Sequence, residues 1–162
     1  MSGSDAEGLL GRSEREASDK LKVFLTSNRR SAWEERTREF KPKPGDLAGV
    51  FKEGVAKRAE EIYLGLWEGE LPMPAPWPGQ TEIQVTACFS EQFGGDDPRA
   101  KAFPAGYETI AALMMPGTIW LSWKYTRPGS DRGACYDGLV KVGNRWIWLL
   151  RANRVLHELA MK

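Results

Sequence analysis

Residues 117–150 read GTIWLSWKYTRPGSDRGACYDGLVKVGNRWIWLL and decide the fold. Three runs rich in β-branched and aromatic residues are separated by two turn signals, a pattern that predicts three antiparallel strands. Gly143-Asn144 is a two-residue hairpin signal, because both central positions of a type I′ turn require positive φ. A two-residue turn pairs Val142 with Arg145 and fixes the register. That register decides which surface is occupied by four of the seven tryptophans in the chain.

The register assigns every residue of the segment to a face of the sheet. It pairs Tyr125 with Ala134, Trp123 with Tyr136, and Ile119 with Val140. The predicted core face is almost purely apolar and comprises Ile119, Leu121, Trp123, Tyr136, Val140, Val142, Ile147 and Leu149. The opposite face mixes aromatic and charged residues and comprises Trp120, Ser122, Lys124, Cys135, Asp137, Leu139, Lys141, Trp146 and Trp148. A one-residue bulge in the loop 127–133 would exchange the faces of residues 118–125.

The chain has 162 residues and a formal net charge of +1, which gives no global argument for nucleic acid or membrane. Residues 1–12 are rich in Ser, Gly and acidic residues and are predicted to form a flexible tail before a single domain over 13–162. The N-terminus has no apolar core of a signal peptide, and no run approaches the ~20 apolar residues of a membrane span. Cys88 and Cys135 are typical of free thiols in a reducing compartment, so we expect a cytoplasmic protein.

The remaining elements are expected from caps and periodicity. Capping boxes at Ser13 and Ser31 predict that helices begin there. Asp46 is a suitable N-cap for a third helix, whose apolar residues follow helical spacing to Leu66. Proline-rich residues 71–80 are predicted to form an extended strap that lays Trp77 on the body of the fold, the alternative being a polyproline ligand for a partner. Residues 81–89 alternate as a half-exposed strand, and further helices are expected around 107–115 and 152–161.

Helices followed by an antiparallel meander predict an α+β domain, with N-terminal helices packed on a C-terminal sheet. This order of elements is similar to that of the cone-shaped nuclear-transport-factor-2-like fold. The likeness is one of element order, because no sequence motif carries it and the chain has one expected strand fewer than that fold normally has. The resemblance implies a cone-like arrangement with a pocket between helices and sheet.

The sequence contains no strong motif for catalysis, metal binding or phosphate binding. His157 is the only histidine and has no partner suggested by spacing, and one His with two distant Cys does not make a zinc set. We therefore expect no cofactor and no metal, and no catalytic residue is assigned. Asp137 is the carboxylate of most interest, because burial on the mixed face would raise its pKa while Lys124 would lower it. Asp137-Gly138 also fits a simple bulge or turn.

Three functions compete. The first is a non-enzymatic interaction protein (a subunit, adaptor or inhibitor) whose Trp-bearing sheet face docks a protein partner or a second copy as a homodimer. The second is a small-molecule-binding or enzymatic cone, so enzymatic activity is left open. The third is a single-strand nucleic-acid binder, disfavoured by the near-neutral charge and the absence of known motifs. No membrane association is expected. The expected binding residues are Trp120, Lys124, Asp137, Lys141, Trp146 and Trp148.

Overall fold

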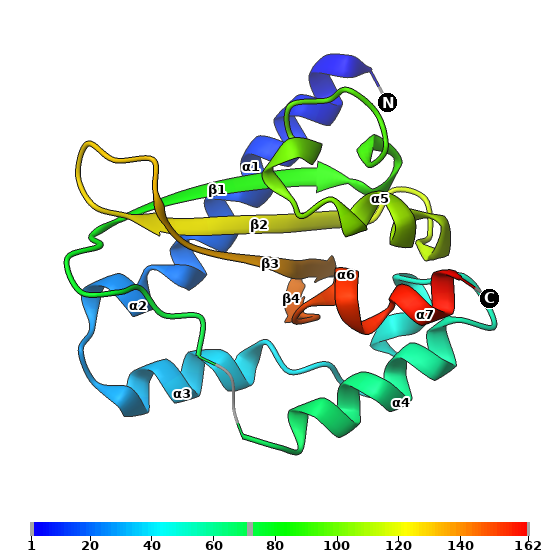
Figure 1. The fold of residues 1–162 in the computed structure, drawn as a ribbon, viewed down its shortest axis with the longest axis horizontal. Coiled ribbons are helices and arrows are strands. Elements are labelled where there is room, and N and C mark those ends of the chain that lie inside the picture. Colours follow the sequence, from blue (N-terminus) through cyan, green and yellow to red (C-terminus); the bar gives the residue numbers. More distant parts are fainter. Residues whose placement is uncertain (1, 71–72, 162) are drawn as a thin grey trace.

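A computed structural model describes residues 2–70 and 73–161 of the chain. One antiparallel sheet of four strands lies at its centre, in the order β1 (Glu82–Phe89), β2 (Ile119–Thr126), β3 (Gly133–Val142) and β4 (Arg145–Trp148). Figure 1 shows the N-terminal helices and the short C-terminal helices arranged around these strands. The predicted α+β class, with helices preceding a C-terminal antiparallel sheet, is therefore confirmed.

The last hairpin forms as predicted, and Val142 pairs with Arg145 across Gly143-Asn144. Tyr125 also pairs with Ala134. The pairing of Ile119 with Val140 is wrong, because Trp120 faces Val140 instead and the register shifts between Leu121 and Ser122.

The shift is a β-bulge at Gly138, not in the loop 127–133. Leu121 faces Leu139 while Ser122 faces Asp137, which leaves Gly138 as the extra residue. Its φ of 92° lies in the left-handed region that glycine adopts without strain. A Cβ at this position would also overlap the carbonyl oxygen of Leu149. Glycine is therefore required here both for conformation and for space.

The bulge exchanges the predicted faces of residues 139–149, since side chains alternate along a strand. Leu139, Trp146 and Trp148 join Leu121 and Trp123 in one core. The other core holds Trp120, Val140, Ile147 and Leu149 on the opposite face. Both faces of the sheet are thus buried at this end, and the predicted division into a core face and a mixed face is corrected.

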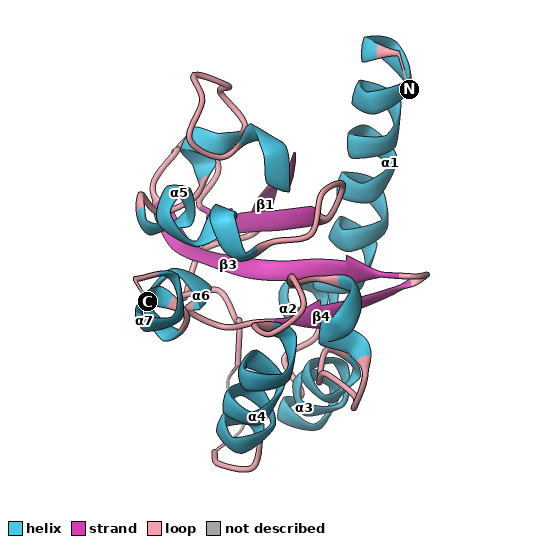
Figure 2. Ribbon diagram, turned by 90° about the vertical axis from the view of Figure 1, so that its right-hand side faces the viewer, coloured by secondary structure: helices cyan, strands magenta, loops and turns pink. Residues whose placement is uncertain are grey.

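Helices cover both faces. Helix α1 (Gly3–Leu21) and the short α2 (Val23–Thr26) pack on the face of Trp123, while α5 (Gly106–Ile110) packs on the face of Trp120. Figure 2 shows α1 and α5 on opposite sides of the strands. Helix α4 (Ala56–Trp67) contributes Tyr63 to one core and Trp67 to the other. The sheet is therefore the middle layer of the fold.

The first helix begins ten residues earlier than its predicted start. Ser2 caps α1 and forms a capping box with Asp5, so the predicted capping box at Ser13 is wrong. Ser13 is instead buried inside the helix. Residues 3–12, predicted as part of a flexible tail, are helical. Their Leu10 side chain packs in the same apolar core as Trp123, which stabilises this part of the helix. Helix α3 (Arg30–Glu39) likewise begins one residue before the predicted capping box at Ser31 and has no side-chain cap.

The third predicted helix is divided. A short 3₁₀ helix, η1 (Asp46–Gly49), precedes α4, and Gly54 between them has a φ of 90° that ends any continuous helix. The prediction that Asp46 caps a long helix is wrong, because Asp46 is the first residue of the short η1. The remaining short elements are η2 (Ser90–Gln92), η3 (Ala100–Ala102), η4 (Ala111–Leu113), α6 (Ala152–Val155) and α7 (His157–Ala160).

The proline-rich strap is anchored through its backbone. Tyr125 Oη donates to Pro74 O at 2.7 Å, and Tyr136 Oη donates to Ala75 O at 2.8 Å. The side chain of Trp77 is 63% exposed, so the prediction that it lies on the body of the fold is wrong. Residues 71–72 of the predicted strap lie outside the described residues.

Candidate functional site

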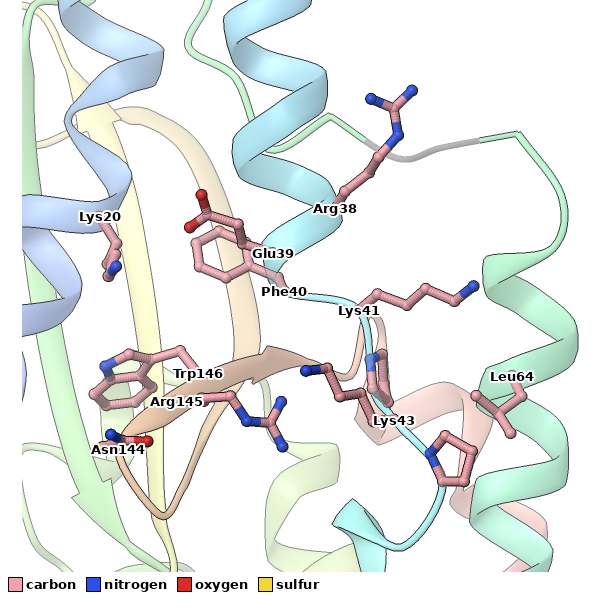
Figure 3. A pocket seen from close by; sticks show the side chains of 12 residues that line it. Lys20, Arg38, Glu39, Phe40, Lys41, Lys43, Leu64, Asn144, Arg145 and Trp146 are labelled. Carbon is pink, nitrogen blue, oxygen red and sulfur yellow. The ribbon is translucent and has the colours of Figure 1, made fainter.

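A groove of about 660 Å³ lies where α1, α3, α4, β4 and the loop after α3 meet, and we call it the basic groove. Figure 3 shows side chains converging on it from the ends of α1 and α3, the loop that follows α3, α4 and β4. Its apolar lining residues are the more accessible Pro44 and Leu64, with the buried Phe40, Pro42 and Trp146 behind them. Its charged residues are Lys20, Arg38, Glu39, Lys41, Lys43 and Arg145. The lining thus includes five cations and one carboxylate, and one of the cations, Arg38, is paired with Glu34 at 3.7 Å.

The ion pairs of the groove leave several cations unneutralised. Glu39 pairs with Arg36, outside the groove, at 2.6 Å. Arg145 pairs with Asp46 through one guanidinium nitrogen, and its Nη1 has no hydrogen-bond partner among the described residues. Lys20, Lys41 and Lys43 take part in no ion pair of the described chain. The groove therefore carries positive charge that its own residues do not compensate.

The loop after α3 is held firmly, which fixes where its lysines begin. Phe40 and Pro42 are buried, and Phe40 O accepts a hydrogen bond of 2.8 Å from Trp148 N of β4. Asp46 Oδ2 accepts from Lys43 N at 2.8 Å, which closes the following turn. The alternating Lys-Pro sequence of 41–44 thus presents its lysines outward from a rigid backbone. Figure 3 shows Lys43 pointing toward the middle of the groove and Arg38 pointing away from it.

The structure does not bring the six expected binding residues together on one surface. Trp120 is fully buried in one core, and Trp146 and Trp148 are buried in the other, each with 5% of its surface exposed. Of these six residues, Trp146 alone borders the basic groove. The two lysines are engaged: Lys124 Nζ donates to Asp131 O at 2.6 Å, and Lys141 pairs with Glu16 at 3.2 Å.

Sequence reasoning missed Lys20, Lys41 and Lys43. The last two belong to a Lys-Pro-Lys-Pro run, residues 41–44, which by itself indicates a helix stop and a turn and not a groove. No local pattern places Lys20 beside them, because that contact depends on how α1 and the loop pack against β4.

Asp137 lies in a separate hollow of about 390 Å³, which we call the Asp137 recess. Its lining residues are Met73, Cys135, Tyr136, Asp137, Trp148, Leu150 and Arg151. Asp137 Oδ1 accepts a hydrogen bond of 2.6 Å from Tyr107 Oη, and Trp148 Nε1 donates to the backbone oxygen of Asp137 at 2.9 Å. The recess shares no lining residue with the basic groove.

Burial dominates the electrostatics of the recess. It raises the pKa of Asp137 above the ordinary value, against smaller lowering effects of the Tyr107 hydrogen bond and of Arg154. Burial and the Asp137 carboxylate together raise the pKa of Tyr107 well above that of a free phenol. Tyr107 therefore stays protonated at neutral pH and acts as a donor to Asp137.

The comparisons with known proteins supply no relative. No family model matches the chain, and no curated protein or solved structure matches it either. The cone-like arrangement implied by the order of elements accordingly stays a prediction. Within residues 2–70 and 73–161, no cluster of three His, Cys, Asp or Glu side chains is arranged to hold a metal. None of the helices in the described ranges has the length and apolar character needed to cross a bilayer.

Proposed function

We propose that this chain is a non-enzymatic interaction protein whose basic groove binds an acidic segment of a protein partner. The observation that supports the proposal most strongly is the unpaired charge of Lys20, Lys41 and Lys43 in a groove that Pro44 and Leu64 also line. A partner segment with carboxylates beside leucine or phenylalanine side chains would complement both features. Complementary charge accelerates association and selects partners, while the apolar contacts supply affinity.

The spread of the cations favours an extended partner over a single small anion. They belong to α1, the end of α3, the following loop and β4, so they surround the groove instead of converging on one point. An extended segment with several carboxylates could engage Lys20, Lys43 and Arg145 together.

The same groove is poorly suited to single-stranded nucleic acid. Binding of that kind combines a basic track with aromatic faces on which bases stack. Phe40 and Trp146 are 1% and 5% exposed, so neither ring offers a free face. The net charge of +1 adds no general attraction for phosphates.

A labelled peptide of alternating glutamate and leucine tests the proposal by fluorescence anisotropy. We expect binding that weakens as ionic strength rises, because exposed charges are screened by salt. Changing Lys41→Glu and Lys43→Glu together should weaken binding by about tenfold or more, since two attractions become repulsions. A matched pair, Lys101→Glu with Arg132→Glu, makes the same charge change at exposed residues outside the groove.

The proposal fails if the control pair weakens binding as much as the groove pair. It also fails if a peptide with lysine in place of glutamate binds equally well, or if an oligonucleotide binds more tightly than the acidic peptide. Light scattering on the protein alone separates a second copy from a different partner, since a homodimer formed through the groove would dissociate in the Lys41→Glu, Lys43→Glu variant.

A further inference from the structure

The Asp137 recess presents two opposite charges that do not neutralise each other. Asp137 and Arg151 both line it, yet neither belongs to an ion pair among the described residues. Tyr107 occupies one carboxylate oxygen of Asp137, and no described residue donates a hydrogen bond to the other, Oδ2. Asp137 is half-buried, and a carboxylate oxygen that no described residue occupies is available to accept a hydrogen bond from a ligand.

We propose that this recess is a binding site for a small zwitterion with an apolar body, such as an aliphatic α-amino acid. The ammonium group would lie on Asp137 and the carboxylate on Arg151. Met73, Leu150 and the edge of Trp148 would contact the apolar part. This site is independent of the groove proposed for a protein partner.

The charges and the size of the recess together select this ligand class. A ligand with only an ammonium group would face the guanidinium of Arg151, and Arg154 lies close enough to influence Asp137. A ligand with only a carboxylate would be repelled by Asp137. A volume of about 390 Å³ is at the lower end of the range of small-molecule sites, which is about 300–1,000 Å³. A zwitterion satisfies both charges within that space.

The backbone departs from regular helix and strand geometry at both charged residues of the recess. Arg151 has a φ of 51°, the one positive value at a non-glycine residue of the described chain. The Gly138 bulge directly follows Asp137, and a Cβ on Gly138 would lie 3.4 Å from Tyr107 Oη. Bulges re-aim neighbouring side chains, and left-handed non-glycine residues persist where the surroundings hold them. Both features position the two charged residues of the recess.

Isothermal titration with three probes tests the inference on the full chain. The probes are L-leucine, 3-methylbutylamine and 4-methylpentanoate, which share an apolar body and differ in their charged groups. We expect L-leucine to bind about tenfold or more tightly than either singly charged probe, because only it engages both ends of the site. Absence of L-leucine binding at millimolar concentration, or equal affinity for the amine, would overturn the proposal.

Two variants test which residue binds the ammonium group of the ligand and which binds its carboxylate. Asp137→Asn keeps the acceptor for Tyr107 and Arg151→Gly suits the left-handed backbone, so both should fold. Each should weaken L-leucine binding by about tenfold or more. Arg151→Gly should also raise the thermal midpoint by roughly 2–4 °C, as expected when strain is released. Asp96→Asn, which makes the same change as Asp137→Asn at an exposed residue outside the recess, should bind within about twofold of the unmodified protein.

The two proposals can fail separately. The Lys41→Glu, Lys43→Glu variant should retain L-leucine binding, and Asp137→Asn should retain binding of the acidic peptide. Unchanged L-leucine affinity in Arg151→Gly would show that the carboxylate of the ligand is not bound there, and the zwitterion assignment would be wrong.

Discussion

The basic groove and the Asp137 recess hold their charges in opposite ways, although both border the same hairpin of β3 and β4. The lysines of the groove are exposed at the ends of flexible side chains, where charges contribute little to stability. Asp137 is half-buried and kept beside Tyr107 by a backbone bulge. The exposed lysines therefore cost the fold little free energy, whereas the ionised form of Asp137 is disfavoured by its burial. Substitutions in the two regions should therefore have different effects on stability.

The largest effect is expected at the bulge that forms the recess. Gly138→Ala places a Cβ against Leu149 O in a backbone with a φ of 92° and should cost about 3–5 kcal/mol of unfolding free energy. Gly143→Ala is the matched control, because Gly143 also has a positive φ, of 63°, but its added Cβ would meet nothing within 4 Å. That control should cost about 1 kcal/mol. Urea unfolding measures both, and equal losses would show that the close approach to Leu149 is unimportant.

A smaller change in the unfolding free energy, this time stabilising, is expected when Asp137 is replaced by Asn. Its pKa is raised in the folded protein, so the folded state binds the proton more tightly than the unfolded state. Stability from this group is present below the ordinary carboxyl pKa of about 3.9 and is lost as pH rises through the raised pKa. Asp137→Asn does not titrate and should therefore be more stable than the unmodified protein at pH 7, as measured by urea unfolding.

The pH profile makes that prediction specific. The advantage of Asp137→Asn should shrink as the pH is lowered and should be smallest below about pH 4. Asp96→Asn, on an exposed loop, removes a carboxylate without removing a buried one and supplies the baseline. An advantage that grows on acidification would mean that Asp137 stabilises the fold as a carboxylate, and would contradict the contrast between recess and groove.

Local sequence patterns predicted the strands better than their faces. Gly143-Asn144 fixes its hairpin through backbone preference alone, and the alternation of residues 81–89 predicted β1. Asp137-Gly138 fits either a continuous strand or a bulge. The choice depends on how closely Leu149 and Tyr107 approach Gly138, and those contacts involve residues that lie apart in the sequence. The exchange of faces follows from that one residue.

The two candidate sites were also predictable to different degrees, because contacts between residues far apart in the sequence leave no local pattern. Asp137 could be singled out because the predicted register, which follows from local turn signals, places it on the mixed face near Lys124. The groove combines Lys20, Lys43 and Arg145, which come from three separate segments of the chain. Their proximity depends on the loop after α3 being bonded to β4 through Phe40 and Trp148. No spacing rule in the sequence reports such a contact.

The smallest effect on stability is expected in the groove. Lys41 and Lys43 are exposed and belong to no ion pair of the described chain, so Lys41→Gln with Lys43→Gln should change the unfolding free energy by less than about 0.5 kcal/mol. The same double variant should bind the acidic peptide more weakly and with a shallower dependence on salt, because two attractive charges are gone. Urea unfolding and anisotropy on one preparation measure both. A stability loss comparable to that of Gly138→Ala would show that the lysines hold the loop in place. The charges of the groove would then affect the stability of the fold, and the contrast with the recess would be wrong.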